Sequence, residues 1–421
     1  MIKKVVTKKL SVIKSESNKK TAKKRGLSSK YFFEDRIERQ YKKFSEKQED
    51  EELSKSYLNT VEKKNSAKKV KTTWIFLIFN IAVVAGLFIF QFSKEGVKPL
   101  SELFAEHPYY RFVFLSLGLF ILINIIEVLK FLFLIHNASK KWRLYLAFKI
   151  AVYGKYWDYV TPLATGGQPF QIIELRKNKF SGDISTGIPL AKYLFWQIAF
   201  LAFSIVVFVT PLKAISTTEA NVVKYAALVG FIANAILFLL NLLIGTNKKV
   251  GEKIIVGSVK LGAKLKIVKN PASTLEKVAI FVDNYQKCMK NFVSSFKVFI
   301  VQTLLAFLGI LAQFSIAYSV YLTFNFPDLT VHSWFEIVAL ALLCEQAISF
   351  IPLPGGAAAA EVSFMALFST LFAARGEGVV FWAMLIWRFC TFYLFIIQGL
   401  IVIFVDALIV KRKIKKQRIS K

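Results

Sequence analysis

The sequence predicts an all-α polytopic membrane protein with six full transmembrane spans and two re-entrant helical hairpins of opposite orientation, arranged as an inverted pseudo-repeat. The first supporting observation is composition. The 421-residue chain is 55% hydrophobic, contains 41 phenylalanines and has a mean hydropathy of +0.48. The second is that two long apolar stretches are interrupted by similar Pro and Gly clusters. The third is the distribution of lysine and arginine, which sets the topology of helical membrane proteins.

Charge divides the chain into three regions. Residues 1–73 carry 22 Lys or Arg and 10 Asp or Glu, contain no apolar run long enough to span, and are expected to be cytoplasmic and largely disordered. The membrane domain covers 74–410, and 411–421 form a basic cytoplasmic tail. No signal peptide is expected, because a long polar segment precedes the first apolar span. Beside transmembrane helices, basic tails indicate topology or anionic lipid rather than nucleic acid.

Six apolar segments are long enough to cross a bilayer, which takes about 20 residues. They are 74–92, 112–135, 188–210, 222–244, 295–322 and 379–406. Two further apolar stretches contain the interruptions. They are 144–163 with 168–175, and 334–351 with 357–373.

The two interruptions have the same pattern, a Pro-Leu that leads into a Gly-Gly pair. The first is TPLATGGQP at 161–169, and the second is IPLPGGA at 351–357. Proline removes a backbone donor and glycine permits positive φ, so each cluster predicts an unwound helix. Paired broken helices in the two halves of a membrane protein indicate a transport site. The alternative is two Pro-kinked spanning helices without a special role.

Lysine placement decides how the broken segments are oriented. Both termini and the lysine-rich loop 245–294 stay on the cytoplasmic side only if the first broken segment enters the membrane and returns to the same face. The second then dips in from the outside, which predicts a multi-pass membrane protein with both termini in the cytoplasm. Within loop 245–294, Lys253, Lys260 and Lys264 follow a helical spacing. This favours either a basic amphipathic helix on the inner leaflet or a solvated connector.

Ionisable residues within the spans are costly and usually functional. Glu127 and Lys130 lie three residues apart and can pair on one helix face, either as a structural pair or at headgroup level. Lys192 lies near the end of its span and is a candidate for snorkelling. Arg388 lies ten residues into the last span. Glu345 precedes the second break by seven residues.

Together these residues predict a site for an anionic group such as a phosphate. A helix that begins at a midplane break points unpaired N–H groups and its positive dipole end into the cavity, with Lys192 and Arg388 nearby. Glu174 and Glu361 would hold these cations when the site is empty, and glutamines, including Gln197, would supply neutral donors and acceptors. The predicted substrate-binding residues are Gly166, Gly167, Gln168, Gln171, Glu174, Lys192, Gly355, Gly356, Glu361 and Arg388.

No metal, cofactor or catalytic residue is expected. Cys288, Cys344 and Cys390 form no paired pattern, and the three histidines show no ligand spacing. No Walker motif is present, so direct driving by ATP is not expected.

At these residues the chain resembles the flippase-like transmembrane domain of the lysylphosphatidylglycerol synthase family. The matching segments are TPLATGGQPFQ at 161–171, AKYLFWQ at 191–197, PLPGG at 352–356, AEVSF at 360–364 and LIWRF at 385–389. The resemblance covers most of 74–410. Glu361 and Arg388 match the family pattern.

Two departures limit what the resemblance implies. Gln168 and Gln171 stand where many relatives have an acid and an Arg, and Ala191-Lys192 replaces a common Glu-Arg pair, so those roles do not carry over. Full-length relatives also carry an aminoacyl-transferase domain that uses lysyl-tRNA. No soluble region here is large enough for that fold, so no lysyltransferase activity is expected from the chain alone.

The sequence leaves three classes of function open. The first is a lipid translocator for an anionic phospholipid or a lipid-linked glycan. The second is a component of lysylphosphatidylglycerol synthesis that needs a separate synthase, and the third is a non-catalytic membrane scaffold. Charged groups beside paired helix breaks favour the translocator, since a scaffold does not need them. The expected partner is a membrane lipid, with a separate synthase or a second copy of the chain as further alternatives.

Overall fold

The computed structural model describes the membrane domain in helical detail. The described residues are Gly86, Ile89 and 99–419, except for 107–108, 213–214, 216, 325–331 and 377, and with only scattered positions described between 265 and 294. All regular elements in this part of the chain are helices. The predicted N-terminal region 1–73 and most of the predicted first span, 74–92, fall outside the described residues.

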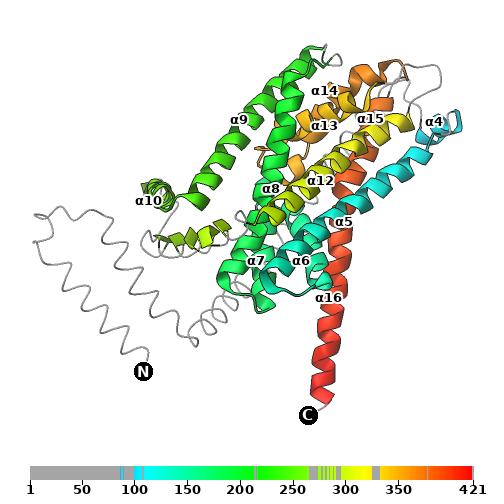
Figure 1. Cartoon of the computed structure of the whole chain (residues 1–421). Helices are drawn as coiled ribbons and strands as arrows, with labels where there is room; N and C mark the ends of the chain where they lie inside the picture. Colours follow the sequence, from blue (N-terminus) through cyan, green and yellow to red (C-terminus); the bar gives the residue numbers. More distant parts are fainter. Residues whose placement is uncertain are drawn as a thin grey trace, which may run out of the picture. The chain divides into compact units, whose positions relative to one another are not determined.

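The elements follow one another as helices joined by short connections (Figure 1). They are α4 (Leu100–Glu106), α5 (Arg111–Ser139), α6 (Leu144–Val160), η2 (Pro162–Ala164), α7 (Gly167–Lys177), α8 (Gly182–Val209), α9 (Thr218–Thr246), α10 (Lys248–Lys264), α12 (Phe296–Thr323), α13 (Trp334–Ile348), η3 (Pro354–Gly356), α14 (Ala359–Ala373), α15 (Val379–Arg388), η4 (Phe389–Tyr393) and α16 (Leu394–Ile419).

Five of the predicted full spans are confirmed as apolar helical stretches of spanning length. Four are the single helices α5, α8, α9 and α12, each 28 or 29 residues long. The fifth, Val379–Asp406, consists of α15, the five-residue π-helix η4 and the start of α16. A sixth stretch, Pro354–Ala373, is also long and apolar enough to cross, although the sequence predicts it as half of a hairpin. Its 20 residues include the second break.

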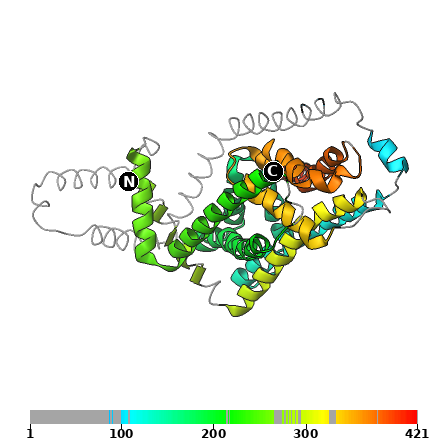
Figure 2. The ribbon, with the colours of Figure 1, turned by 90° about the horizontal axis from the view of Figure 1, so that it is seen from above.

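Long apolar helices pack closely around a core rich in phenylalanine. Helix α5 runs alongside α12, as Figure 2 shows with the cyan and yellow ribbons. Helix α9 approaches α13 at Gly230, where a Cβ atom would lie 2.0 Å from the backbone oxygen of Gln346. Such a close approach requires glycine. Beside it, the Asn234 amide donates to the Gln346 side chain at 3.0 Å, and the Gln346 amide donates to Ser204 at 2.8 Å. These buried hydrogen bonds fix how α8, α9 and α13 pack together.

Both predicted helix breaks are confirmed. A 3-10 turn separates α6 from α7, and another lies between α13 and α14. In the second break, Gly355 and Gly356 have the expected positive φ of 59° and 61°. In the first break the positive φ values fall on Leu163 and Ala164 instead, so the role expected there for the glycines is wrong.

The glycines of the first break serve close packing. A Cβ atom at Gly167 would lie 2.3 Å from Oδ1 of Asp158, and one at Gly166 would lie 2.8 Å from the backbone oxygen of Trp157. Therefore α7 can fold back against α6 only with small residues at its start. Helices α6 and α7 are also in close contact further from the break, since a Cβ atom at Gly154 would overlap the side-chain amide of Gln171.

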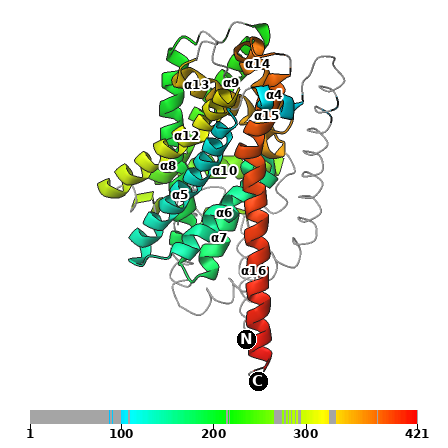
Figure 3. The same ribbon diagram turned by 90° about the vertical axis from the view of Figure 1, so that its right-hand side faces the viewer.

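The two breaks lie against each other in the structure. Turn η2 contacts η3, and α6 also contacts η3. Figures 1 and 3 show α6 and α7 at one end of the helical bundle and α13 and α14 at the other. Segments almost 200 residues apart in the sequence thus meet at their interruptions.

Helix α10 lies within the predicted lysine-rich loop and carries the expected helical pattern. Lys253, Lys260 and Lys264 are exposed, whereas Val259 is buried against Val282. This part of the loop is therefore helical, and its position on the inner leaflet stays a prediction. At the C-terminus, α16 continues as a helix through the basic tail to Ile419.

Candidate functional site

The start of α7 is capped by side chains of the preceding helix and break. The Gly166 N–H donates to Oγ1 of Thr161 at 2.8 Å, and the Gly167 N–H donates to Oδ1 of Asp158 at 2.9 Å. The prediction that these N–H groups point unpaired into a cavity is therefore wrong. A carboxylate nine residues earlier in the chain already occupies the positive end of the helix.

The second break is held by Arg388. Its Nε donates to Oε1 of Glu361 at 2.7 Å, and its Nη2 donates to the backbone oxygen of Gly355 at 2.5 Å. The guanidinium also lies 4.3 Å from the centre of the Phe392 ring. Arg388 and Glu361 are almost completely buried, at 4% and 0% exposure. The predicted pairing of these two residues is confirmed, and it stabilises a glycine carbonyl that the broken helix leaves without a helical partner.

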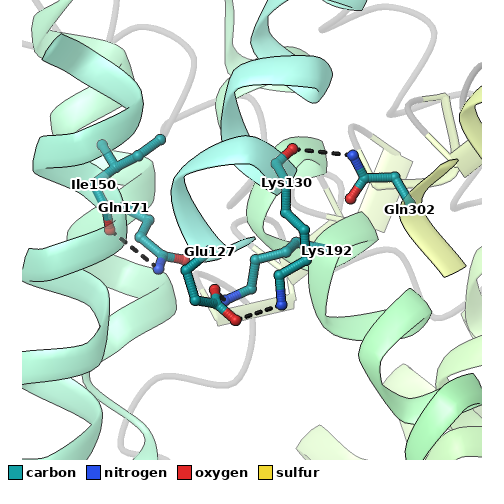
Figure 4. Close-up of polar contacts among 6 residues, drawn as sticks. All are labelled: Glu127, Lys130, Ile150, Gln171, Lys192 and Gln302. Atoms are coloured by element: carbon teal, nitrogen blue, oxygen red, sulfur yellow. Dashed lines mark hydrogen bonds and ion pairs between the residues drawn. The ribbon is translucent and has the colours of Figure 1, made fainter. Parts of the chain in front are cut away.

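A second buried cluster joins α5 to α8 (Figure 4). The Glu127 carboxylate pairs with Lys130 through one oxygen and with Lys192 through the other, the latter at 2.9 Å. Gln302 of α12 donates to the backbone oxygen of Lys130 at 3.0 Å. The predicted pairing of Glu127 with Lys130 is confirmed. Snorkelling of Lys192 is not seen, because its amine points to Glu127 and its side chain is only 15% exposed.

Glu174 does not hold Lys192, which corrects the prediction. Its carboxylate instead pairs with Lys149 of α6 at 2.7 Å. Lys149 also pairs with Asp406 of α16 at 2.7 Å, and Asp406 accepts hydrogen bonds from Tyr145 at 3.0 Å and Tyr153 at 2.9 Å. The cause is the folding back of α7, which places Glu174 beside the first turns of α6. These ion pairs and hydrogen bonds link α6 to α7 and to α16.

The predicted glutamines fall into different surroundings. Gln171 is buried, and its amide donates to the backbone oxygen of Ile150 at 3.4 Å (Figure 4). Gln197 is also buried, and neither polar atom of its side chain has a hydrogen-bond partner in the described structure. Gln168 is partly exposed at the start of α7. These three residues therefore do not form one donor set.

Three charged residues between the two clusters were not assigned to the site from the sequence. They are Lys155 and Asp158 of α6 and Glu345 of α13, all partly exposed. Lys155 interacts electrostatically with Glu127, Asp158 and Glu345, and Glu345 also interacts with Arg388. A feature of the sequence could have indicated two of them. Lys155 and Asp158 are opposite charges three residues apart, and they come shortly before the Thr-Pro of the first break.

The arrangement thus gathers charge where the two breaks meet. Four cations (Lys130, Lys155, Lys192 and Arg388) alternate with four carboxylates (Glu127, Asp158, Glu345 and Glu361). Such a set can bind an anionic group by exchanging one partner of a cation for the incoming oxygen atoms. Within the described ranges, no group of three or more His, Cys, Asp or Glu side chains could hold a metal ion.

The long apolar helices and their buried charges define a multi-pass helical membrane protein. The family model described as the lysylphosphatidylglycerol synthase TM region matches residues 77–399. Because this match covers well over half of the chain, the chain belongs to that family. No curated protein matches the sequence. No solved structure matches it either.

Proposed function

We propose that this protein is a lipid translocator that moves an anionic phospholipid or a lipid-linked glycan between the leaflets of the bacterial plasma membrane. The family and the membrane-helical architecture fit a function related to membrane lipids. The choice of translocation among such functions rests on the contact between the two helix breaks and on the charges around them.

The contact between η2 and η3 is the observation that carries the proposal. Helix breaks leave backbone polar groups that hydrocarbon cannot satisfy, so they are tolerated only beside protein or water. Here Arg388 contacts the second break and Asp158 the first, and Lys155 interacts electrostatically with Asp158. Together these charges suit a polar headgroup. A scaffold or anchor would not require this costly arrangement.

We further propose that α6–α7 and α13–α14 are re-entrant hairpins that enter from opposite faces. The positions of these pairs at opposite ends of the bundle support this orientation (Figure 3). An inverted pair gives the headgroup a path from each leaflet to the same central site. The apolar length of Pro354–Ala373 allows the alternative in which the second pair includes a full span.

The proposed topology places both termini and the lysine-rich loop in the cytoplasm. In a chain otherwise without accessible cysteine, we expect a cysteine at Lys264 to resist a membrane-impermeant thiol reagent in intact cells. The same cysteine should react after the cells are permeabilised. Reaction in intact cells would contradict the topology.

The direct test is lipid translocation in reconstituted vesicles. The purified chain is placed in phosphatidylcholine vesicles that contain fluorescent phosphatidylglycerol, and an impermeant reductant bleaches the outer leaflet. We expect the inner-leaflet label to become accessible to the reductant over time. Protein-free vesicles provide the control and should keep this label protected. A folded, correctly inserted protein that gives the protein-free result would reject translocation of this lipid class.

The same preparation addresses the alternative role in lipid synthesis. If the chain only supports a separate synthase, it should leave lipids in their leaflets and bind that synthase instead. Translocation by the chain alone favours the proposal over both this role and a scaffold.

A further inference from the structure

We infer that Lys155 is the residue that receives the anionic group of the substrate. This inference rests on the proposed function and goes beyond it by assigning the binding cation. It also separates Lys155 from Arg388 and Lys192, which the structure shows in other contacts.

Lys155 differs from the other central cations because it forms no ion pair with a carboxylate among the described residues. Lys130, Lys192 and Arg388 each pair directly with a carboxylate. Among the described residues, Lys155 forms neither a hydrogen bond nor an ion pair. An ammonium group in a membrane domain is costly to leave unpaired, so its presence indicates a ligand or a pathway.

The surroundings of Lys155 keep the ammonium in place without neutralising it. The nitrogen lies 5.7 Å from the ring centre of Tyr159 and 5.5 Å from that of Phe395. Aromatic faces attract a cation but leave its three donors free for an acceptor. The residue is only partly buried, and its nitrogen is not among the fully enclosed polar atoms without partners. The ammonium nitrogen therefore keeps some exposed surface.

Three carboxylates lie near Lys155 without forming an ion pair with it. Lys155 interacts electrostatically with Glu127 of α5, Glu345 of α13 and Asp158 of its own helix. Glu127 already binds two lysines, and Asp158 accepts from the Gly167 N–H. Lys155 is therefore the central cation that an incoming anionic group can bind without breaking an existing ion pair.

Amine labelling tests the site without measuring transport. The detergent-solubilised full chain is treated with acetic anhydride, and modified lysines are mapped by peptide mass spectrometry. The labelling is carried out at alkaline pH, where part of each amine is neutral, and we expect Lys155 to be modified. Phosphatidylglycerol should slow this modification, whereas the zwitterionic phosphatidylcholine should slow it less. An unreactive Lys155, or equal protection by both lipids, would overturn the inference.

Translocation provides the second readout. In the vesicle assay, Lys155→Gln should slow phosphatidylglycerol movement by about 10-fold or more, the effect of losing one charge-assisted hydrogen bond. Lys155→Arg should retain most of the rate, because it keeps the charge. Lys260→Gln on the exposed face of α10 is the matched control and should behave as wild type.

The two proposals fail in different ways. If the wild-type chain moves no lipid, the translocator proposal fails, and labelling alone decides whether Lys155 binds an anionic headgroup. If the wild-type chain translocates and a folded Lys155→Gln variant matches it, the translocator proposal stands and Lys155 is not the binding cation.

Discussion

Replacement of Arg388 by alanine is expected to abolish lipid translocation and to destabilise the protein. The change leaves the fully buried Glu361 carboxylate without its cation and the Gly355 carbonyl without its donor. Breaking a buried ion pair from one side costs about 3–5 kcal/mol. Arg388→Lys should also be impaired, because an ammonium cannot reproduce the planar fork that reaches both acceptors.

A second substitution, at Glu361, tests how much of the Arg388→Ala effect comes from the buried carboxylate that loses its cation. Glu361→Gln in the Arg388→Ala background should restore part of the stability, because it removes the unpaired buried charge. The free energy of unfolding and the translocation rate of the four proteins in this cycle give the coupling between the two residues. Arg111→Ala, at an exposed position of α5, is the control for loss of an arginine. Normal transport by Arg388→Ala at normal expression would exclude Arg388 from the site.

Substitution of alanine for Gly355 should disrupt the second break. The residue has φ of 59°, and a Cβ atom there would lie 2.1 Å from Cε2 of Phe392. The left-handed backbone alone costs a non-glycine residue about 1–2 kcal/mol. The buried Phe392 ring must also move, and it carries the Arg388 guanidinium on its face. We therefore expect a lower melting temperature and little translocation.

The matched control for this change is Gly118→Ala in α5. Nothing lies within 4 Å of a Cβ atom at Gly118, and its φ is not in the left-handed region. Alanine there should maintain or raise stability, by up to about 1 kcal/mol from helix propensity. Equal stability of the Gly355→Ala and Gly118→Ala proteins would show that the second break does not require its observed conformation.

Sequence reasoning was most successful where a local rule applies. Proline and glycine clusters predicted both breaks, because proline lacks the donor that an unbroken helix needs. The pairing of Arg388 with Glu361 was also predicted, since a charge deep in a span requires a partner and few acids were within reach. Spacing of three residues was enough to pair Glu127 with Lys130.

Contacts that depend on the crossing of distant helices were not predicted. Lys192 meets Glu127 because α8 packs against α5, and no pattern within either helix specifies that meeting. Asp158 caps α7 only because the chain folds back, and positive φ at Leu163 and Ala164 contradicts their residue type. Lys155 was overlooked although it lies within the apolar stretch 144–163, since a long lysine side chain in such a segment often reaches solvent.

The π-helix η4 has a consequence for the whole last span. A π turn accommodates an extra residue, which rotates the following helix by about 100° relative to an uninterrupted α-helix. Arg388 before η4 faces the second break, and Asp406 after it faces Lys149 and the tyrosines of α6. In one continuous α-helix, the face that carries Asp406 would be turned by about 100° relative to Arg388. The last span therefore consists of two α-helical segments that are offset by the one extra residue of the π turn. A shift of the π turn along the span would rotate one segment about its axis while the other keeps its contacts.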